Sequence, residues 1–192
     1  MKIFLETERL IFRQFTENDL DNLFELNNDP DVVRFANLTG KPTEYEDIKQ
    51  QVLPRFLKYY NLYDSYGIWA AIEKSSKNFI GWFHFRPNLE NTAIDNPEEI
   101  ELGYRLRKSA WGKGYATEGS RELILKGFSE LKIQCVVATA LVANVASIRV
   151  MEKAGLKFER YFLETRFIGG NQEAVKYSLD QAQFRIEEYL AT

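Results

Sequence analysis

The stretch that decides the fold is EIELGYRLRKSAWGKGYAT, residues 99–117, in which a strand, a glycine-containing turn and the start of a helix follow one another. Its first part predicts a strand over residues 100–106, and the pattern that follows predicts a helix over residues 115–130. Gly112 and Gly114 allow the turn between them to be tight and to approach a ligand closely. Because the first amides of a helix have no intrahelical acceptors, this terminus favours an anion.

Strand and helix patterns on both sides of this stretch predict one mixed α/β domain that covers residues 1–192, with a partly antiparallel sheet. The expected strands lie within residues 8–15, 66–72, 79–85, 100–106, 133–141, 158–167 and 172–179. The expected helices cover residues 16–28, 43–60, 115–130 and 145–154, and a short helix closes the chain. Thr16 caps the first helix, Pro54 kinks the second and Gly155 ends the fourth. The last two strands are joined by a turn at residues 169–171.

The composition excludes several classes of protein. With one cysteine and one histidine, Cys135 and His84, the chain has no internal disulfide and no thiolate and imidazole set for a structural metal. The net charge of -3 gives no overall basic excess that would attract nucleic acid. No apolar run approaches the length of about 18 residues that spans a membrane, and the N-terminus lacks a secretion signal. We therefore expect a cytoplasmic protein that binds no metal, nucleic acid or membrane.

Charge is locally polarised around the central stretch. Residues 102–114 contain four basic residues and no acid, namely Arg105, Arg107, Lys108 and Lys113, whereas residues 90–101 contain five acids and no base. The basic part supports an anion site at the glycine turn, although a plain surface turn with solvated charges is the alternative. Gly103 lies inside a predicted strand, where glycine often marks a bulge or the close approach of a backbone or ligand.

Three other phosphate and hydrolase motifs do not fit. A P-loop requires Ser or Thr after its Gly-Lys pair, but Lys113 is followed by Gly114. A dinucleotide fingerprint requires a third glycine where Thr117 stands. A serine hydrolase would have to use His84, and the chain has no G-x-S-x-G elbow. His84 is instead expected to be structural or to face a substrate.

At these residues the sequence resembles the GNAT superfamily of acyl-CoA-dependent N-acyltransferases, in particular the ribosomal-protein N-terminal acetyltransferases. WGKGYA at residues 111–116 resembles the pyrophosphate signature of the family, with Trp111 in place of the usual Gln or Arg. GYRL at residues 103–106 resembles its splayed fourth strand, and NVASIRVMEKAGLKFE at residues 144–159 its second cofactor segment. The resemblance implies a mostly antiparallel sheet of about seven strands, splayed between the fourth and fifth, with four or five helices.

The resemblance implies acetyl-CoA as co-substrate, bound by the glycine turn, the opened strand edge and the later helix. The cofactor-binding residues it implies are Tyr104, Leu106, Arg107, Trp111, Gly112, Lys113, Gly114, Tyr115, Ala116, Thr117, Asn144 and Ser147. Leu106 is the candidate oxyanion donor, because its backbone N–H could stabilise the developing charge on the thioester oxygen. Such a donor contributes roughly 3–4 kcal/mol at other acyl-transfer sites. Asn144 and Ser147 could alternatively serve only to cap the helix and to bond the local backbone.

Direct transfer to an amine requires a base but no covalent intermediate, so Cys135 is expected to be a structural thiol. Glu101 is the leading base candidate because it shares a strand face with Gly103, and Glu99 is the local competitor. A water relay, or a purely structural carboxylate, is the alternative. Many members of the family have a tyrosine as general acid where Met151 stands, so this chain lacks that acid. Ser147 matches a serine assigned as general acid in the resembled branch.

The acceptor is expected to be a primary amine, foremost the N-terminal α-amine of a protein or peptide. The ordinary pKa of an α-amine, near 8 against about 10.4 for lysine, demands less of a base. Small-molecule amines such as a polyamine, an amino acid or an aminoglycoside, and a non-catalytic acyl-CoA sensor, are the alternatives. The acidic residues 90–101 could attract a cationic amine. An aromatic wall at Tyr59, Tyr60, Tyr63 and Tyr66 could line the site, but core packing is favoured for each. Homodimers are common in the resembled family.

Overall fold

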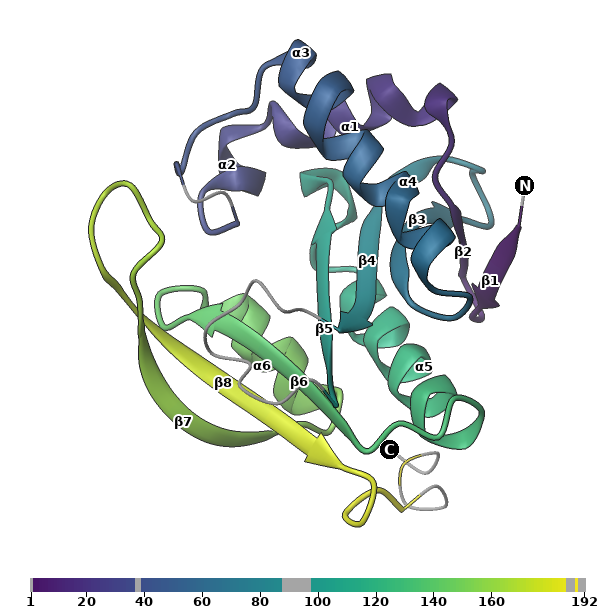
Figure 1. Ribbon diagram of the computed structural model, residues 1–192, viewed down its shortest axis with the longest axis vertical. Helices are drawn as coiled ribbons and strands as arrows, with labels where there is room; N and C mark the ends of the chain where they lie inside the picture. Colours follow the sequence, from purple (N-terminus) through teal and green to yellow (C-terminus); the bar gives the residue numbers. More distant parts are fainter. Residues whose placement is uncertain (1, 37–38, 88–97, 186–188, 190–192) are drawn as a thin grey trace.

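A single sheet of eight strands organises the computed structural model, which describes residues 2–36, 39–87, 98–185 and 189 (Figure 1). Its strand order is β1-β2-β3-β4-β5-β6-β8-β7. The strands are β1 Ile3–Glu6, β2 Leu10–Gln14, β3 Gly67–Glu73, β4 Phe79–Pro87, β5 Glu99–Leu106, β6 Cys135–Leu141, β7 Lys157–Glu164 and β8 Gln172–Asp180. The seven expected strands are all present, and β1 is an additional edge strand that the sequence analysis did not predict.

All neighbouring strands are antiparallel except β5 and β6, which are parallel. These two strands pair only at the start of β5, where residues 99–101 lie opposite residues 135–137. Beyond Glu101 the two strands separate, and β6 continues its pairing with β8 instead. The splay expected between the fourth and fifth strands is therefore confirmed, at β5 and β6 in the eight-strand numbering.

The helices of the first half are short and gather at one end of the molecule (Figure 1). They are α1 Leu20–Asn27, α2 Pro30–Val33, α3 Tyr45–Asp47 and α4 Leu53–Leu62. The predicted start at Thr16 is confirmed, because its N–H donates to the Asp19 carboxylate at 2.9 Å ahead of a 3-10 turn. Near Pro54 the predicted kink takes the form of a π-helical segment, Ile48–Val52, that leads into α4.

Two further helices, α5 Tyr115–Ser129 and α6 Val145–Lys153, lie beside β4, β5 and β6 (Figure 1). α5 approaches the sheet closely at Gly119, where an added Cβ would lie 2.6 Å from the Phe83 ring. That ring stacks on Phe12 of β2, with 4.7 Å between the ring centroids. This aromatic core fixes the position of α5, and therefore of the turn that precedes it, relative to β5.

The chain leaves α6 at Gly155, which has φ +92°, and returns through the β7–β8 hairpin. The predicted last helix and the acidic positions Glu90 and Asp95 lie in segments outside the described residues, apart from Tyr189. Within the described ranges, no helix is long and apolar enough to cross a membrane.

Candidate active site

Beyond Glu101, the splay leaves one edge of β5 without a strand partner among the described residues. Arg107 N–H donates to Ile80 O at 2.8 Å, and the register between β4 and β5 is unbroken from Gly81 to Pro87. Because hydrogen-bonding direction alternates along an antiparallel pair, the backbone groups of residues 102, 104 and 106 face away from β4. They therefore point into the gap that opens toward β6.

A cavity of about 410 Å³ on one side of β5 and another of about 510 Å³ on the other flank this gap. We call the larger one the glycine-loop cavity, because Gly112 and Gly114 line it. Of the predicted cofactor residues, all but Arg107 and Lys113 line it: Tyr104, Leu106, Trp111, Gly112, Gly114, Tyr115, Ala116, Thr117, Asn144 and Ser147. The structure thus brings two distant segments, the turn before α5 and the start of α6, to one cavity.

The backbone of this cavity suits a phosphate group. Gly112 and Gly114 have φ +72° and +83°, so both occupy the left-handed region that glycine adopts without strain. Nothing lies within 4 Å of a Cβ built on Gly112, which leaves an open cradle in front of the first amides of the 15-residue helix α5. Free amides at a helix N-terminus are an anion site, so the residues present fit the pyrophosphate of acetyl-CoA.

Two side chains brace this turn. The Trp111 indole N–H donates to Leu106 O at 2.9 Å, so the residue that replaces the usual Gln or Arg ties the turn to the end of β5. Arg9 donates to Lys113 O at 3.0 Å and forms an ion pair of 2.6 Å with Glu118 in the first turn of α5. Arg9 lies about a hundred positions before the motif, and no sequence pattern predicted its role.

Asn144 has the capping role that the sequence left open, and Asn144 and Ser147 both line the cavity. The Asn144 side chain accepts a hydrogen bond from Ser147 N–H at 3.2 Å and so caps α6. The hydroxyl groups of Ser147 and Tyr104 are hydrogen-bonded, and burial of Tyr104 raises its pKa against the effect of this bond. Met151 is buried behind them.

The sequence suggested that the basic side chains of residues 102–114 support one anion site, but the structure separates them. The Arg107 guanidinium forms an ion pair of 2.7 Å with Glu25 on α1, and Lys108 pairs with Asp31 on α2 at 2.5 Å. Arg105 projects from the face of β5 opposite to Tyr104 and Leu106. Carboxylates from α1 and α2 therefore neutralise charges that the sequence assigned to a ligand. Arg105 nevertheless also lines the glycine-loop cavity, together with three cations that the sequence did not predict: Arg34, Arg149 and Lys153.

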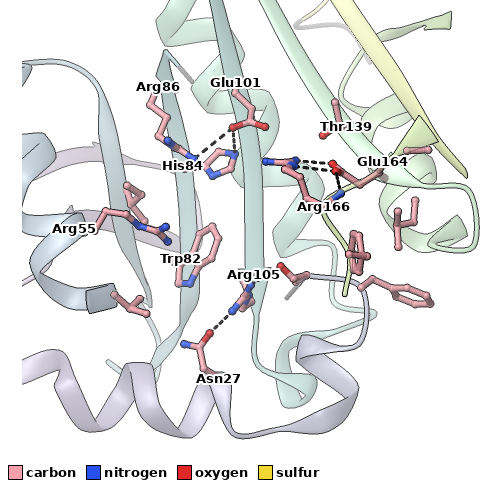
Figure 2. Close-up of a pocket in the computed structure, with 18 of the residues that line it drawn as sticks. Asn27, Arg55, Trp82, His84, Arg86, Glu101, Arg105, Thr139, Glu164 and Arg166 are labelled. Carbon is pink, nitrogen blue, oxygen red and sulfur yellow. Dashed lines mark hydrogen bonds and ion pairs between the residues drawn. The ribbon is translucent and has the colours of Figure 1, made fainter. Parts of the chain in front are cut away.

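The second cavity lies on the other face of β4 and β5, and we call it the arginine cavity (Figure 2). Its charged lining residues are Arg55, Arg86, Arg105, Arg166, Glu101 and Glu164. Cross-strand pairs build its floor: Arg86 lies opposite Glu101, His84 opposite Gly103, and Trp82 opposite Arg105. Arg55 comes from α4, and Glu164 and Arg166 come from the end of β7 and the segment after it.

Glu101 lies in this cavity, and Glu99 does not. The buried Glu101 carboxylate is 3.6 Å from the Arg86 guanidinium and 3.6 Å from His84 Nε2 (Figure 2). Glu99 points elsewhere and pairs with the buried Lys176 at 2.9 Å. Of the two competing carboxylates, only Glu101 therefore faces a space where an acceptor amine could lie.

His84 fills the place left by the missing side chain of Gly103. A Cβ on Gly103 would lie 2.4 Å from His84 Nε2, and the register there has no bulge. The expectation of a bulge at Gly103 is thus wrong, and a histidine ring occupies the space on its side-chain face. Burial lowers the pKa of His84 to about 4, against the pull of Glu101, so the ring is neutral at pH 7.

A third space of about 220 Å³ joins the two cavities through the splay. It shares Tyr104 and Ser147 with the glycine-loop cavity and His84 and Glu101 with the arginine cavity. Groups bound on the two sides of β5 can therefore meet in this gap.

The remaining candidates have structural positions. Burial and the neighbouring Asp180 raise the pKa of the Cys135 thiol to about 12, so it is no nucleophile at neutral pH. Of the four tyrosines proposed as an aromatic wall, Tyr59 lines the arginine cavity, and Tyr60 bonds the backbone of Ile68 in the core. The described part of the chain holds no cluster of three His, Cys, Asp or Glu side chains that could bind a metal.

Comparisons with known proteins agree with this geometry. The acetyltransferase (GNAT) domain family matches residues 9–157. FsC-acetyl coenzyme A-N(2)-transacetylase of Aspergillus fumigatus is 28% identical over 186 residues, which cover 94% of this chain and 77% of that protein. YdaF of Bacillus subtilis, a proposed ribosomal N-acetyltransferase, is 26% identical over 184 residues, which cover 94% and 96% of the two chains.

Among solved structures, RimL, a ribosomal α-N-protein acetyltransferase in complex with coenzyme A, has the same fold. It superposes with a TM-score of 0.77 at 17% identity, and the match covers 95% of this chain and 100% of RimL. The family match extends over most of the chain and includes both the glycine turn and the start of α6. The chain therefore belongs to the GNAT family and is an acetyl-CoA-dependent N-acetyltransferase.

Proposed function

We propose that the enzyme acetylates the α-amine at the N-terminus of a protein or peptide. The observation that carries this proposal is the charge of the arginine cavity, whose described lining has four arginines against two glutamates. A polyamine or an aminoglycoside carries several positive charges, which this lining would repel. An N-terminal segment brings one amine to the site and can carry neutral or acidic side chains beside it.

Acetyl-CoA supplies an acetyl thioester, which the glycine-loop cavity would hold. The amides at the start of α5 would bind the pyrophosphate, and the free edge of β5 at Tyr104 and Leu106 would pair with the pantetheine as a further strand. Leu106 O already accepts from Trp111, whereas Leu106 N–H faces the gap without a strand partner. This N–H is our candidate donor to the thioester oxygen.

On the opposite face of β5, Glu101 would take the proton of the acceptor. The neighbouring Arg86 favours the ionised carboxylate, which is the form that accepts a proton. The amine nitrogen then forms a bond to the thioester carbon, and the carbon–sulfur bond breaks. Since an α-amine has an ordinary pKa near 8, a carboxylate base of this kind suits it better than it suits a lysine amine near 10.4.

The leaving sulfur would take a proton from the hydrogen-bonded pair of Ser147 and Tyr104. Ser147 lies in the shared part of the cavities, on the cofactor side of β5. Because a thiol has a pKa near 8.5, its thiolate leaves almost unaided at neutral pH, so this proton transfer contributes little to the rate.

A small-molecule amine is the second candidate. It is favoured by the relative named FsC-acetyl coenzyme A-N(2)-transacetylase, which matches 94% of this chain. The non-catalytic sensor that the sequence left open is set aside, because the chain belongs to an N-acetyltransferase family.

The test is release of CoA thiol at saturating acetyl-CoA with a panel of acceptors: N-terminal peptides, spermidine, free amino acids and an aminoglycoside. We expect the highest kcat/KM with a peptide. A higher value for any of the small amines would overturn the α-amine proposal, and so would thiol release at the level of the blank with every peptide.

A further inference from the structure

Two arginines of the arginine cavity have no carboxylate partner among the described residues. Arg86 contacts Glu101 and Arg166 contacts Glu164, at 3.6 Å and 2.5 Å. Arg105 instead donates to neutral oxygens only, the side-chain amide of Asn27 and the backbone carbonyl of Ala36 (Figure 2). For Arg55 the described structure holds no hydrogen bond or ion pair, only the nearby ring of Phe56.

These two cations are also close enough to repel each other. Burial, together with the positive charge of Arg55, lowers the pKa of Arg105 to about 10. Arg105 Nε is buried without a hydrogen-bond partner, and the Arg105 guanidinium lies 5.3 Å from the ring centroid of Trp82. A half-buried charge that faces only neutral groups and another cation is unfavourable unless a ligand supplies the opposite charge.

The position of this pair relative to Glu101 fits an acceptor rather than an isolated anion. Arg105 is four residues from Glu101 on the same face of β5, which places the two Cα atoms about 13 Å apart. Two long side chains that converge on one cavity shorten this separation. One ligand can therefore present an amine to Glu101 and, a few bonds away, an anionic group to Arg105 and Arg55.

We propose that Arg105 and Arg55 form an anion-binding subsite that selects acceptors with a carboxylate close to the reactive amine, foremost peptides with an acidic side chain at the second position. The inference rests on the proposed function and names the acceptor class of that site. A planar guanidinium can donate two parallel hydrogen bonds to a carboxylate, which makes arginine a selective partner for this group. The α-carboxylate of a free amino acid offers the same chemistry from another source.

The experiment uses the full chain and three C-terminally amidated peptides that differ only at position two, with Glu, Gln or Lys after an N-terminal Ser. We expect kcat/KM to be about ten- to a hundredfold higher for the Glu peptide than for the Gln peptide, the range of a charge-assisted hydrogen-bonded pair. The Lys peptide should be the poorest acceptor. Raising the salt concentration from 0.05 M to 0.5 M should lower the ratio of kcat/KM for the Glu peptide to that for the Gln peptide, since added ions screen the attraction.

Arg55→Gln and Arg105→Gln then assign the preference to the subsite. Each should reduce kcat/KM for the Glu peptide far more than for the Gln peptide, so the ratio falls toward one. A purely structural role for Arg105 would lower both peptides equally and leave the ratio unchanged. Lys58→Gln removes the same charge from an exposed position of α4 outside the cavity, and it should change neither value.

The outcomes distinguish a failure of the anion subsite from a failure of the proposed function. If peptides are acetylated without a preference for Glu, or with a preference for Lys, the anion subsite is wrong while the proposed function stands. If a free amino acid is acetylated faster than every peptide and faster than its own α-amide, and Arg105→Gln removes the advantage over the amide, the subsite stands and the peptide acceptor is wrong. If Arg105→Gln raises the Kd of acetyl-CoA and leaves the Glu-to-Gln ratio intact, Arg105 serves the cofactor and the inference fails.

Discussion

The glycine-loop cavity and the arginine cavity flank the same strand, β5, but they differ in which parts of the chain line them. One contiguous segment, residues 104–117, supplies about half of the lining of the first, and residues 31–36 and α6 supply the rest. The charged side chains of the second come from α4, β4, β5, the end of β7 and the segment after it, which are far apart in the sequence. Backbone donors on a contiguous segment leave a motif, whereas converging side chains leave none. The cofactor side is therefore constrained by conformation, and the acceptor side by the identity of individual side chains.

Gly114→Pro should have the largest effect, and it should affect only the cofactor side. Proline fixes φ near -65°, so it cannot adopt the +83° of Gly114, and the turn before α5 must rearrange. We expect the Kd of acetyl-CoA to rise by about a hundredfold or more while the domain stays folded. Isothermal titration with acetyl-CoA measures this, and circular dichroism checks the fold.

Gly169→Ala is the control, because that glycine lies in the β7–β8 turn with nothing within 4 Å of an added Cβ. An unchanged affinity in Gly114→Pro would remove the glycine turn from the cofactor site.

Glu101→Gln should act on the acceptor side and spare acetyl-CoA binding. Below the pKa of the acceptor amine, proton removal limits the rate, so kcat/KM should fall by about a hundredfold at pH 6. Above pH 9 the amine is already neutral, and the loss should be much smaller. The pH profile of kcat/KM, compared with the wild type, measures the difference.

Glu99→Gln provides the matched control on the same strand. It removes the nearer of the two carboxylates that pair with the buried Lys176, so it should lower the free energy of unfolding but keep the shape of the pH profile. A ratio of Glu101→Gln to wild type that is independent of pH would demote Glu101 from base to structural carboxylate.

His84 should make the free energy of unfolding of the unliganded protein fall as the pH is lowered. Its folded pKa of about 4 lies below the ordinary value of 6.5, so the unfolded state binds the proton more readily. The stability from its neutral form is complete above pH 6.5 and is lost as the pH falls toward 4. Between pH 7 and pH 5 the free energy of unfolding should fall by about 2 kcal/mol more in the wild type than in His84→Gln.

Urea denaturation at the two pH values measures this difference. An equal loss in both proteins would show that the ring is not held neutral by its burial.

Ser147→Ala should have the smallest effect of the series. The leaving thiolate needs little protonation at neutral pH, so kcat should fall only about two- to fivefold. Pre-steady-state measurement of thiol release isolates this step, with Ser129→Ala at the far end of α5 as the control. A loss of a hundredfold would make Ser147 an essential acid rather than a minor contributor.

Most of the fold could be predicted from sequence because its strands and helices have clear periodicity. The hairpin of β3 and β4, the strand and helix around Gly112, and the cap at Thr16 all follow local patterns. β1 was missed because it is a four-residue edge strand with little buried apolar surface. Its pairing with β2 is decided by tertiary contact rather than by a local pattern.

The candidate site, too, could be predicted from the sequence only where its features are local. Residues 111–117 could be predicted, since turn and helix-terminus chemistry is local. The partners of Arg107 and Lys108 could not, because Glu25 and Asp31 reach them only through the packing of α1 and α2. Arg105 was assigned to the basic stretch by its neighbours in sequence, but strand alternation turns it to the opposite face. The charged side chains of the arginine cavity come together only when α4, β4, β5 and the end of β7 have converged.

The most direct test of the account is a crystal structure of the protein with coenzyme A. We expect the pyrophosphate at the amides of residues 112–117, the pantetheine along the free edge of β5 at Tyr104 and Leu106, and the sulfur in the gap between β5 and β6. Glu101 should then face the sulfur from the arginine cavity. A cofactor bound outside the splay, or with its sulfur out of reach of that cavity, would contradict the claim that the two sides meet across β5.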